Sequence, residues 1–275
     1  MNDPAGGVAF FADLRYDPKY KMADYTPPEN LDVEAVLLGG DIEYRPEPLV
    51  KLIEEFKEKQ RPGTLIVHIP GNEEHAGHDI AESKREYRER LSTVPNAVYL
   101  DNDVFVLPSG MRIIGTTLWD QIDEDAIEPF VTAVEHIPGV EPRRPGSREV
   151  EMRATNALYL EARAWVEKEL RKLTPAERER TIVVSHHWPT QRPWMDANGE
   201  FPPDPNGIEH RWFSAGATYM DALLTEVGPK YWLCGHAHET KSVTIGKTIV
   251  RSNPFVGNQL GITNPEFDAG FVIEA

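Results

Sequence analysis

The chain has 275 residues, of which 40% are hydrophobic and 27% are charged, so it is long enough to bury a substantial core and has the composition of a globular protein. Its net charge of −16 argues against nucleic acid as the main ligand, because a polyanion is held by basic side chains that release its counterions. No apolar run is long enough to span a bilayer, and no basic segment followed by an apolar one opens the chain, so we expect neither a membrane segment nor a signal peptide.

Apolar runs that read as buried strands alternate with amphipathic stretches that read as helices, which predicts an α/β architecture. The first helical stretch begins with prolines suited to a first turn and stops at Arg61-Pro62-Gly63. We predict buried strands at residues 7–12, 33–39, 64–69 and 181–186. We predict helices at residues 46–60, 78–91, 156–173 and 216–227.

The middle and the carboxyl-terminal parts of the chain carry closely spaced strands, which we interpret as hairpins and edge strands. They cover residues 96–100, 103–107, 111–118, 241–245, 247–252 and 269–274. A Gly-Lys pair at 246–247 supplies a turn signal in the last group. The simplest fold is an α/β arrangement in which two packed sheets form a β-sandwich flanked by α-helices, in one domain over residues 1–275.

Polar side chains follow the ends of five apolar runs. In an open α/β sheet, ligands bind at the carboxyl ends of the strands, so we expect these side chains to converge on one crevice. An aspartate alone there often caps a turn, and a histidine alone is often packed or solvated, but five such segments in order are hard to attribute to coincidence. The residues are Asp13, Asp41, Glu43, Asn72, His186, His187, His236 and His238.

Oxygen and nitrogen donors of this mixture suit borderline divalent ions, with Mn²⁺, Fe²⁺ and Zn²⁺ as the main candidates and one or two ions per chain. An aspartate between two ions can bridge them, and such a pair can clamp a phosphoryl group and activate a water. Cys234 is the only cysteine, which excludes an intramolecular disulfide and predicts a reducing, cytoplasmic compartment.

Five segments, "ADLR", "GGDIE", "PGNEE", "VVSHH" and "CGHAH", resemble in order the motifs of the calcineurin-like metallophosphoesterase superfamily. The family motifs read Asp-x-His, Gly-Asp, Gly-Asn-His-Glu, a strand-end His and Gly-His-x-His. "GTTLWD", "IVRSNPFVG" and "NPEFDAGFVIE" look like those of a bacterial branch of soluble phosphoesterases. The resemblance covers nearly the whole chain and implies a two-sheet sandwich flanked by helices, in agreement with the fold predicted above.

The resemblance also implies roles for individual residues. Asp41 would bridge two metal ions. One ion would be completed by Asn72, His186 and His236, and the other by Asp13 and His238. His187 would be a neighbour of a ligand and not itself a ligand.

Two positions depart from the family pattern. Arg15 stands where the family has a metal-ligand histidine, and a guanidinium has no acceptor lone pair with which to ligate. Glu73 stands where the family has its catalytic histidine. We therefore expect the ion held with Asn72 and His186 to bind better than the ion held with Asp13 and His238.

Three hypotheses on function follow. In the first, the protein is a phosphoesterase for a small phosphorylated substrate, with Arg15 binding a phosphate oxygen and Glu73, or a nearby imidazole such as His75, transferring a proton. In the second, it is a catalytically impaired relative that binds a phosphorylated ligand or a protein partner, with Arg15 and Glu73 paired in the old site. In the third, it is a nuclease or binds nucleic acid, against which its acidic charge counts. The sequence favours the first.

Two long irregular stretches, 120–147 and 188–212, have the length of lids or binding loops. The second is the main candidate for substrate contact, and its alternative is a solvated surface loop. Trp119 is expected to pack against the core. The side chains considered for substrate contact are Arg192, Trp194, His210 and Arg211.

Overall fold

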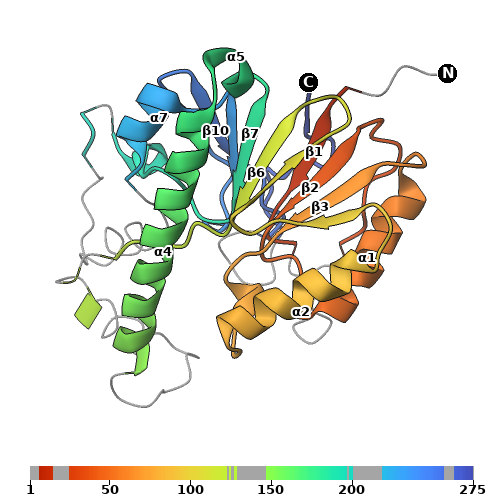
Figure 1. Cartoon of the computed structure of the whole chain (residues 1–275), viewed down its shortest axis with the longest axis horizontal. Helices are drawn as coiled ribbons and strands as arrows, with labels where there is room; N and C mark the ends of the chain where they lie inside the picture. The colour runs from red at the N-terminus through yellow and green to blue at the C-terminus, as the bar shows by residue number, and fades with distance from the viewer. Residues whose placement is uncertain are drawn as a thin grey trace.

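The structure is a computed structural model in which two sheets lie face to face with helices outside both (Figure 1). This is the predicted α/β sandwich. The residues that the structure describes are 6–14, 25–122, 124, 127–128, 147–196, 198–200, 219–256 and 263–274. In the described part of the chain, no helix is long and apolar enough to cross a membrane.

The first sheet has five strands in the order β11-β1-β2-β3-β4. β1 to β4 run parallel to one another, and β11 pairs antiparallel with β1 at the edge. Every described residue of β1 and β2 is buried, as expected for parallel strands covered on both faces. The strands are β1 (Val8–Phe11), β2 (Ala35–Gly39), β3 (Leu65–Ile69), β4 (Ala97–Tyr99) and β11 (Val272–Ile273).

The second sheet has six strands in the order β5-β6-β7-β8-β10-β9. Its four central strands are parallel, and the edge strands β5 and β9 pair antiparallel with β6 and β10. The strands are β5 (Asp103–Val106), β6 (Arg112–Thr116), β7 (Thr181–Ser185), β8 (Tyr231–Cys234), β9 (Ser242–Ile245) and β10 (Thr248–Ser252).

Helices cover the outer face of each sheet (Figure 1). α1 (Pro46–Lys59) and α2 (Ile80–Ser92) lie against the first sheet. α4 (Ser147–Lys172) and α7 (Asp221–Val227) lie against the second, and the short α5 (Pro175–Arg178) leads into β7. Two 3₁₀ turns complete the described elements, η2 (Glu73–His75) and η3 (Arg192–Trp194).

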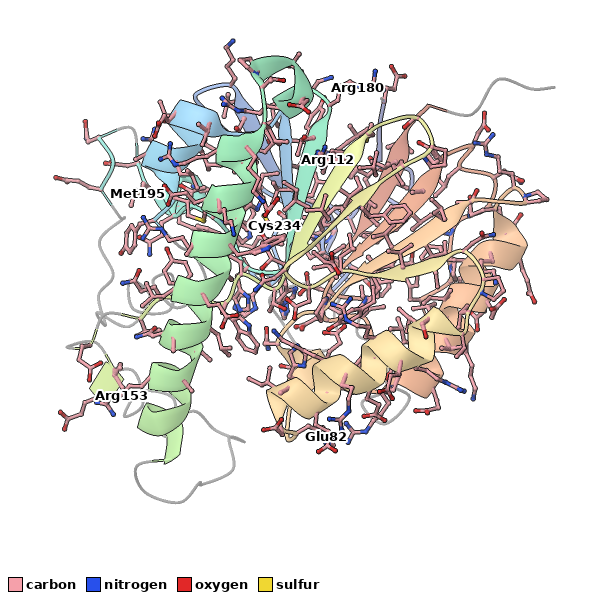
Figure 2. All side chains as sticks on the ribbon, in the orientation of Figure 1. Glu82, Arg112, Arg153, Arg180, Met195 and Cys234 are labelled. Atoms are coloured by element: carbon pink, nitrogen blue, oxygen red, sulfur yellow. The ribbon has the colours of Figure 1, made fainter. Side chains whose placement is uncertain are left out.

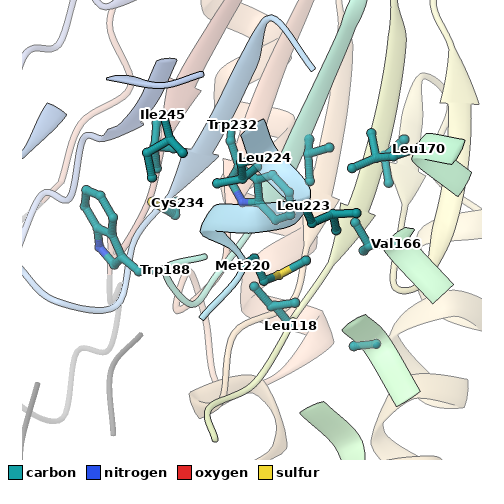
Figure 3. Packing of buried hydrophobic residues seen from close by; sticks show 14 of the residues in the cluster. Leu118, Val166, Leu170, Trp188, Met220, Leu223, Leu224, Trp232, Cys234 and Ile245 are labelled. Atoms are coloured by element: carbon teal, nitrogen blue, oxygen red, sulfur yellow. The ribbon is translucent and has the colours of Figure 1, made fainter. Parts of the chain in front are cut away.

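The core has three layers because side chains alternate across each strand. In β1, Phe10 lies in the cluster between the two sheets, and Phe11 lies in the cluster under α1 and α2. A third cluster joins α4 and α7 to the second sheet and includes Trp232 of β8, Leu223 and Leu224 of α7, and Val166 of α4 (Figure 3). Both sheets are therefore packed on both faces, and the strand-end loops extend from this core.

Three predicted elements differ from the observed ones. The segments 96–100 and 103–107 are edge strands as predicted, but they do not pair with each other, because β4 is the edge of the first sheet and β5 the edge of the second. The predicted hairpin is formed by β5 and β6. α4 begins at Ser147, earlier than predicted, because the good helix formers that follow Gly146 extend it. α7 begins at Asp221 rather than 216, and residues 216–218 lie outside the described part.

Candidate metal centre

The loops that follow β1, β2, β3, β7 and β8 meet where the two sheets come together. Figure 2 places Arg112 and Arg180 at the amino ends of β6 and β7, and Cys234, which ends β8, lies away from them. The polar residues that follow β7 and β8 therefore lie at the end of the second sheet opposite these arginines. The first sheet supplies Asp13, Asp41 and Asn72, and the second supplies His186, His187, His236 and His238.

Four of these residues have a left-handed backbone, which is rare for residues other than glycine. Asp13 has φ of 51°, Asp41 of 52°, His236 of 67° and His238 of 55°. Such conformations are held only when the surroundings over-determine them, and they cluster at functional sites. Here they turn each side chain sharply at the end of its strand.

Donor atoms of the predicted ligands gather in two groups that share Asp41. One group is Asp41, His186 and His236, and the other is Asp13, Asp41 and His238; within each group the donor atoms lie within 4.8 Å of one another. His186 Nε2 lies 3.3 Å from Asp41 Oδ1, and His238 Nε2 lies 3.4 Å from Asp13 Oδ1. A tetrahedral ion with bonds of about 2.0–2.1 Å holds its donor atoms about 3.4 Å apart, so both groups fit a divalent ion.

Asn72 lies in the loop that contacts Asp41. Its Nδ2 donates to Glu73 Oε1 at 3.2 Å, which leaves Oδ1 buried without a hydrogen-bond partner among the described residues. The backbone N–H of Glu73 donates to Asp41 Oδ1 at 3.0 Å. A buried amide oxygen without a hydrogen-bond donor is a suitable ligand for a divalent cation.

Small residues make room for the ligands. A Cβ on Gly71 would overlap the carboxylate of Asp41, and a Cβ on Gly235 would overlap that of Asp13. The glycines of the Gly-Asn and Gly-His segments therefore allow the strand-end loops to approach the two aspartates closely.

Glu74 joins the loops after β2 and β3. Its buried carboxylate accepts hydrogen bonds from the backbone N–H groups of Asp41 at 3.0 Å, Ile42 at 2.8 Å and Gly71 at 2.8 Å. Burial raises the pKa of the Glu74 carboxyl to about 7, although these backbone donors favour its ionised form. The second glutamate of "PGNEE" is thus a brace for the loop that carries Asp41.

A hydrogen bond from the other ring nitrogen sets the orientation and the tautomer of His186. The carbonyl oxygen of Gly39 can only accept, so His186 Nδ1 donates to it at 3.0 Å and Nε2 faces Asp41. Burial lowers the pKa of His186, but the charge of Asp41 outweighs burial and raises it to about 10, so a metal ion that binds at Nε2 would displace a proton from it. Burial lowers the pKa of His187 to about 3 and that of His236 well below its usual range, so both are neutral and able to ligate at pH 7.

The remaining predicted residues are placed differently. Arg15, His210 and Arg211 lie outside the described residues, as does any pairing of Arg15 with Glu73. Arg192 forms an ion pair with Asp221, and Trp194 is buried against Trp188. The core position predicted for Trp119 is confirmed, since only 6% of it is exposed.

His75, weighed as a proton donor, is buried, and its Nδ1 lies 2.9 Å from Ser83 Oγ. Burial lowers its pKa to about 4, so it is neutral at pH 7. This imidazole therefore brings no acidic proton at neutral pH.

Asp120 was not among the predicted site residues. Its carboxylate forms a third group of candidate metal ligands with His187 and His236. Burial raises the pKa of this carboxyl well above its usual range. The strand-end rule that identified the other ligands applies here as well, since "TLWD" follows β6, but Asp120 comes later after its strand than they do.

Comparison with known proteins identifies the fold and the family of the chain. The fold is shared by phosphopantetheinyl hydrolase from Mycobacterium tuberculosis, at 14% identity over 92% of this chain and 91% of that one with a TM-score of 0.57. A dimetal phosphatase from Danio rerio aligns at 14% identity over 93% of this chain and 88% of that one, with a TM-score of 0.49. By sequence, no curated protein matches the chain. A sequence model described as calcineurin-like phosphoesterase matches residues 8–240. The chain therefore belongs to the calcineurin-like phosphoesterase family, hydrolases that act on phosphate ester bonds.

Proposed function

We propose that the protein hydrolyses a small phosphomonoester or phosphodiester with a metal-activated water. The observation that carries the proposal is the position of Asp41, whose carboxylate belongs to two donor groups at once. A shared carboxylate is the feature that holds two ions close enough to act on one phosphoryl group. The ligands that we propose are Asp13, Asp41, Asn72, His186, His236 and His238.

One or two divalent ions, Mn²⁺, Fe²⁺ or Zn²⁺, would hold phosphoryl oxygens and lower the pKa of a bound water. The protein itself holds the metal-ligand atoms in position before the substrate binds. Glu74 braces the Asp41 loop, the carbonyl of Gly39 selects the tautomer of His186, and Glu73 orients the amide of Asn72. Preorganised donors stabilise developing charge without reorganisation during the reaction.

Glu73 has two proposed roles. The family position predicts a catalytic group there, and a carboxyl at that point is suited to move a proton to the leaving oxygen. Its contact with Asn72 Nδ2 makes it in addition a positioning residue for a metal ligand. Arg15 is proposed to bind a phosphate oxygen with its guanidinium.

The contact between Glu73 and Asn72 also favours a second candidate function. A carboxylate that is engaged in holding a ligand can preserve the metal centre without protonating a leaving group. The alternative is therefore a catalytically impaired family member that binds a phosphorylated ligand or a protein partner.

Hydrolysis of p-nitrophenyl phosphate and bis-p-nitrophenyl phosphate by protein loaded with Mn²⁺, Fe²⁺ or Zn²⁺ tests the first function. We expect turnover with at least one ion, reduced by Asp41→Asn at least about 100-fold, which is ~2.7 kcal/mol of transition-state stabilisation. Absence of turnover with every ion would contradict it.

The double variant Arg15→His with Glu73→His separates the two candidates. A strong rise in turnover would show that the native pair impairs catalysis and would support the binding function. A loss of existing turnover would show that the native pair takes part in the reaction.

A further inference from the structure

We propose that Asp120, His187 and His236 form a third divalent-cation site beside the centre built on Asp41. The site goes beyond the phosphoesterase proposal, since it uses two residues that the family pattern does not assign as ligands. One carboxylate and two imidazoles are the donor set of borderline ions, so the expected occupants are Zn²⁺, Mn²⁺ or Fe²⁺.

The distances in this group fit an ion better than they fit hydrogen bonds. Asp120 Oδ2 lies 3.4 Å from His187 Nε2 and 3.6 Å from His236 Nε2. Hydrogen bonds between nitrogen and oxygen are normally about 2.7–3.2 Å long. Donor atoms around a tetrahedral ion lie about 3.4 Å apart. The group has the spacing already found for the pairs of Asp41 with His186 and of Asp13 with His238.

The tautomer of His187 is set for ligation. Its Nδ1 lies 3.1 Å from the backbone carbonyl oxygen of Thr117, which can only accept, so Nδ1 carries the proton. The lone pair of Nε2 is then directed to Asp120. This is the support that metal-ligating histidines receive from a backbone carbonyl, and His186 receives the same from Gly39.

The carboxylate of Asp120 has few partners for a buried group. Its side chain is 13% exposed, and its Oδ2 faces the Nε2 atoms of His187 and His236. Its Oδ1 has no hydrogen-bond partner among the described residues. A carboxylate oxygen that is buried and accepts no hydrogen bond would be satisfied by a divalent ion.

The backbone before Asp120 is strained in a way that aims it at the group. Leu118 has φ of 67° and Trp119 of 59°, values that are unusual for a branched and for a bulky aromatic residue. The indole of Trp119 stacks on His187 at 5.9 Å between ring centres. Strain of this kind persists where the surroundings hold it, and here it turns Asp120 back toward the two histidines.

His236 is shared between this site and the group of Asp41 and His186. When His236 serves the third site, Asp41, His186 and Asn72 remain for the first ion. The third site therefore adds an ion without emptying the centre, and it lies on the side of that centre formed by β6 and β7.

The experiment counts ions in the intact protein. Equilibrium dialysis against Zn²⁺, followed by elemental analysis, is applied to the native chain and to Asp120→Asn and His187→Phe. The phenylalanine keeps the ring that stacks on Trp119 but removes the nitrogen donors. Asp103→Asn is the matched control, because Asp103 is an exposed carboxylate paired with Arg88. We expect both site variants to bind one equivalent less than the native chain and the control.

Equal ion counts in all four proteins would overturn the proposal. Anomalous diffraction from Zn²⁺-soaked native crystals is the check that needs no variant to fold. A peak about 2.1 Å from Asp120 and His187 supports the site, and no peak there at full occupancy of the Asp41 groups overturns it. Ion counts and turnover are separate readouts, so failure of this site is distinguishable from failure of the proposed hydrolase function.

Discussion

The carboxylate of Glu74 accepts a hydrogen bond at 3.0 Å from the backbone N–H of Asp41, a residue in a different strand-end loop. The same carboxylate accepts from Gly71 at 2.8 Å, so one side chain fixes the relative position of two loops. Asp41 has a left-handed backbone at this point, with φ of 52°. The geometry of the candidate bridging ligand therefore depends on a residue that does not itself face the proposed ions.

Glu74→Gln should destabilise the protein by about 1–3 kcal/mol, because an amide NH₂ replaces one acceptor oxygen and leaves buried backbone N–H groups unsatisfied. The free energy of unfolding in urea measures this. Glu82→Gln is the control, since Glu82 lies on the exposed face of α2 (Figure 2), and we expect a change within about 0.5 kcal/mol. Equal changes in the free energy of unfolding for the two variants would contradict the conclusion that Glu74 holds the Asp41 loop in place.

Glu73→Ala should weaken metal binding about 10–100-fold, the usual range for loss of a group that orients a ligand. Glu73→Gln keeps an oxygen that can accept from Asn72 Nδ2 and should retain most of the affinity. Isothermal titration with Mn²⁺ compares the two variants. If alanine and glutamine bind the ion equally well, the contact with Asn72 does not position the ligand.

Acid should destabilise the protein through His68, which is buried between Tyr87 and Tyr99. Burial lowers the pKa of His68 to about 3, against about 6.5 when unfolded. As pH falls from 6.5 toward 3, the unfolded chain binds a proton that the folded protein refuses, so the free energy of unfolding decreases by about 1.4 kcal/mol per pH unit from this group.

His68→Phe should remove this contribution while keeping an aromatic ring in place. Urea unfolding of the native chain and the variant at several pH values between 6.5 and 5 gives the two slopes. The exposed His78 serves as the control, and His78→Gln should leave the native slope unchanged. An identical pH dependence of His68→Phe and the native chain would refute the assignment.

Metal removal should lower thermal stability. An ion bound only by the folded state contributes about 2.7 kcal/mol at a hundredfold excess over its Kd, or roughly 5–10 °C for a chain of this size. Differential scanning calorimetry with and without EDTA, followed by readdition of Zn²⁺, measures the shift. His186→Gln should shrink it, because this change removes a buried donor of the Asp41 group. A melting temperature insensitive to EDTA would argue against any ion in this centre.

Most of the candidate site could be predicted from two rules, one on polar residues that follow buried strands and one on the alignment of parallel strands. Asp13, Asp41 and His186 come directly after buried strands, and parallel strands bring their carboxyl ends together. Asp120 was not predicted as a site residue, because its position depends on the left-handed turn at Leu118 and Trp119, which a sequence pattern does not reveal.

The sequence also does not show which sheet each strand joins or which of two adjacent side chains is buried. Alternation marks β4 and β5 as strands, but it carries no information on which sheet each one joins. Of the adjacent Glu73 and Glu74, only the fold decides which carboxylate is buried as a brace and which one holds Asn72. Both residues are glutamates at adjacent positions, so only the structure shows which contacts each one makes.

The crossing of the chain from β4 to β5 divides the centre between two halves of the polypeptide. All predicted oxygen ligands, Asp13, Asp41 and Asn72, precede the crossing, and all predicted nitrogen ligands, His186, His236 and His238, follow it. Two fragments separated between these strands would divide the ligands predicted from the sequence, with the oxygen donors in one fragment and the imidazoles in the other. Reassociation of such fragments should therefore be metal-dependent, because an ion bound by donors from both fragments would hold the two parts of the chain together.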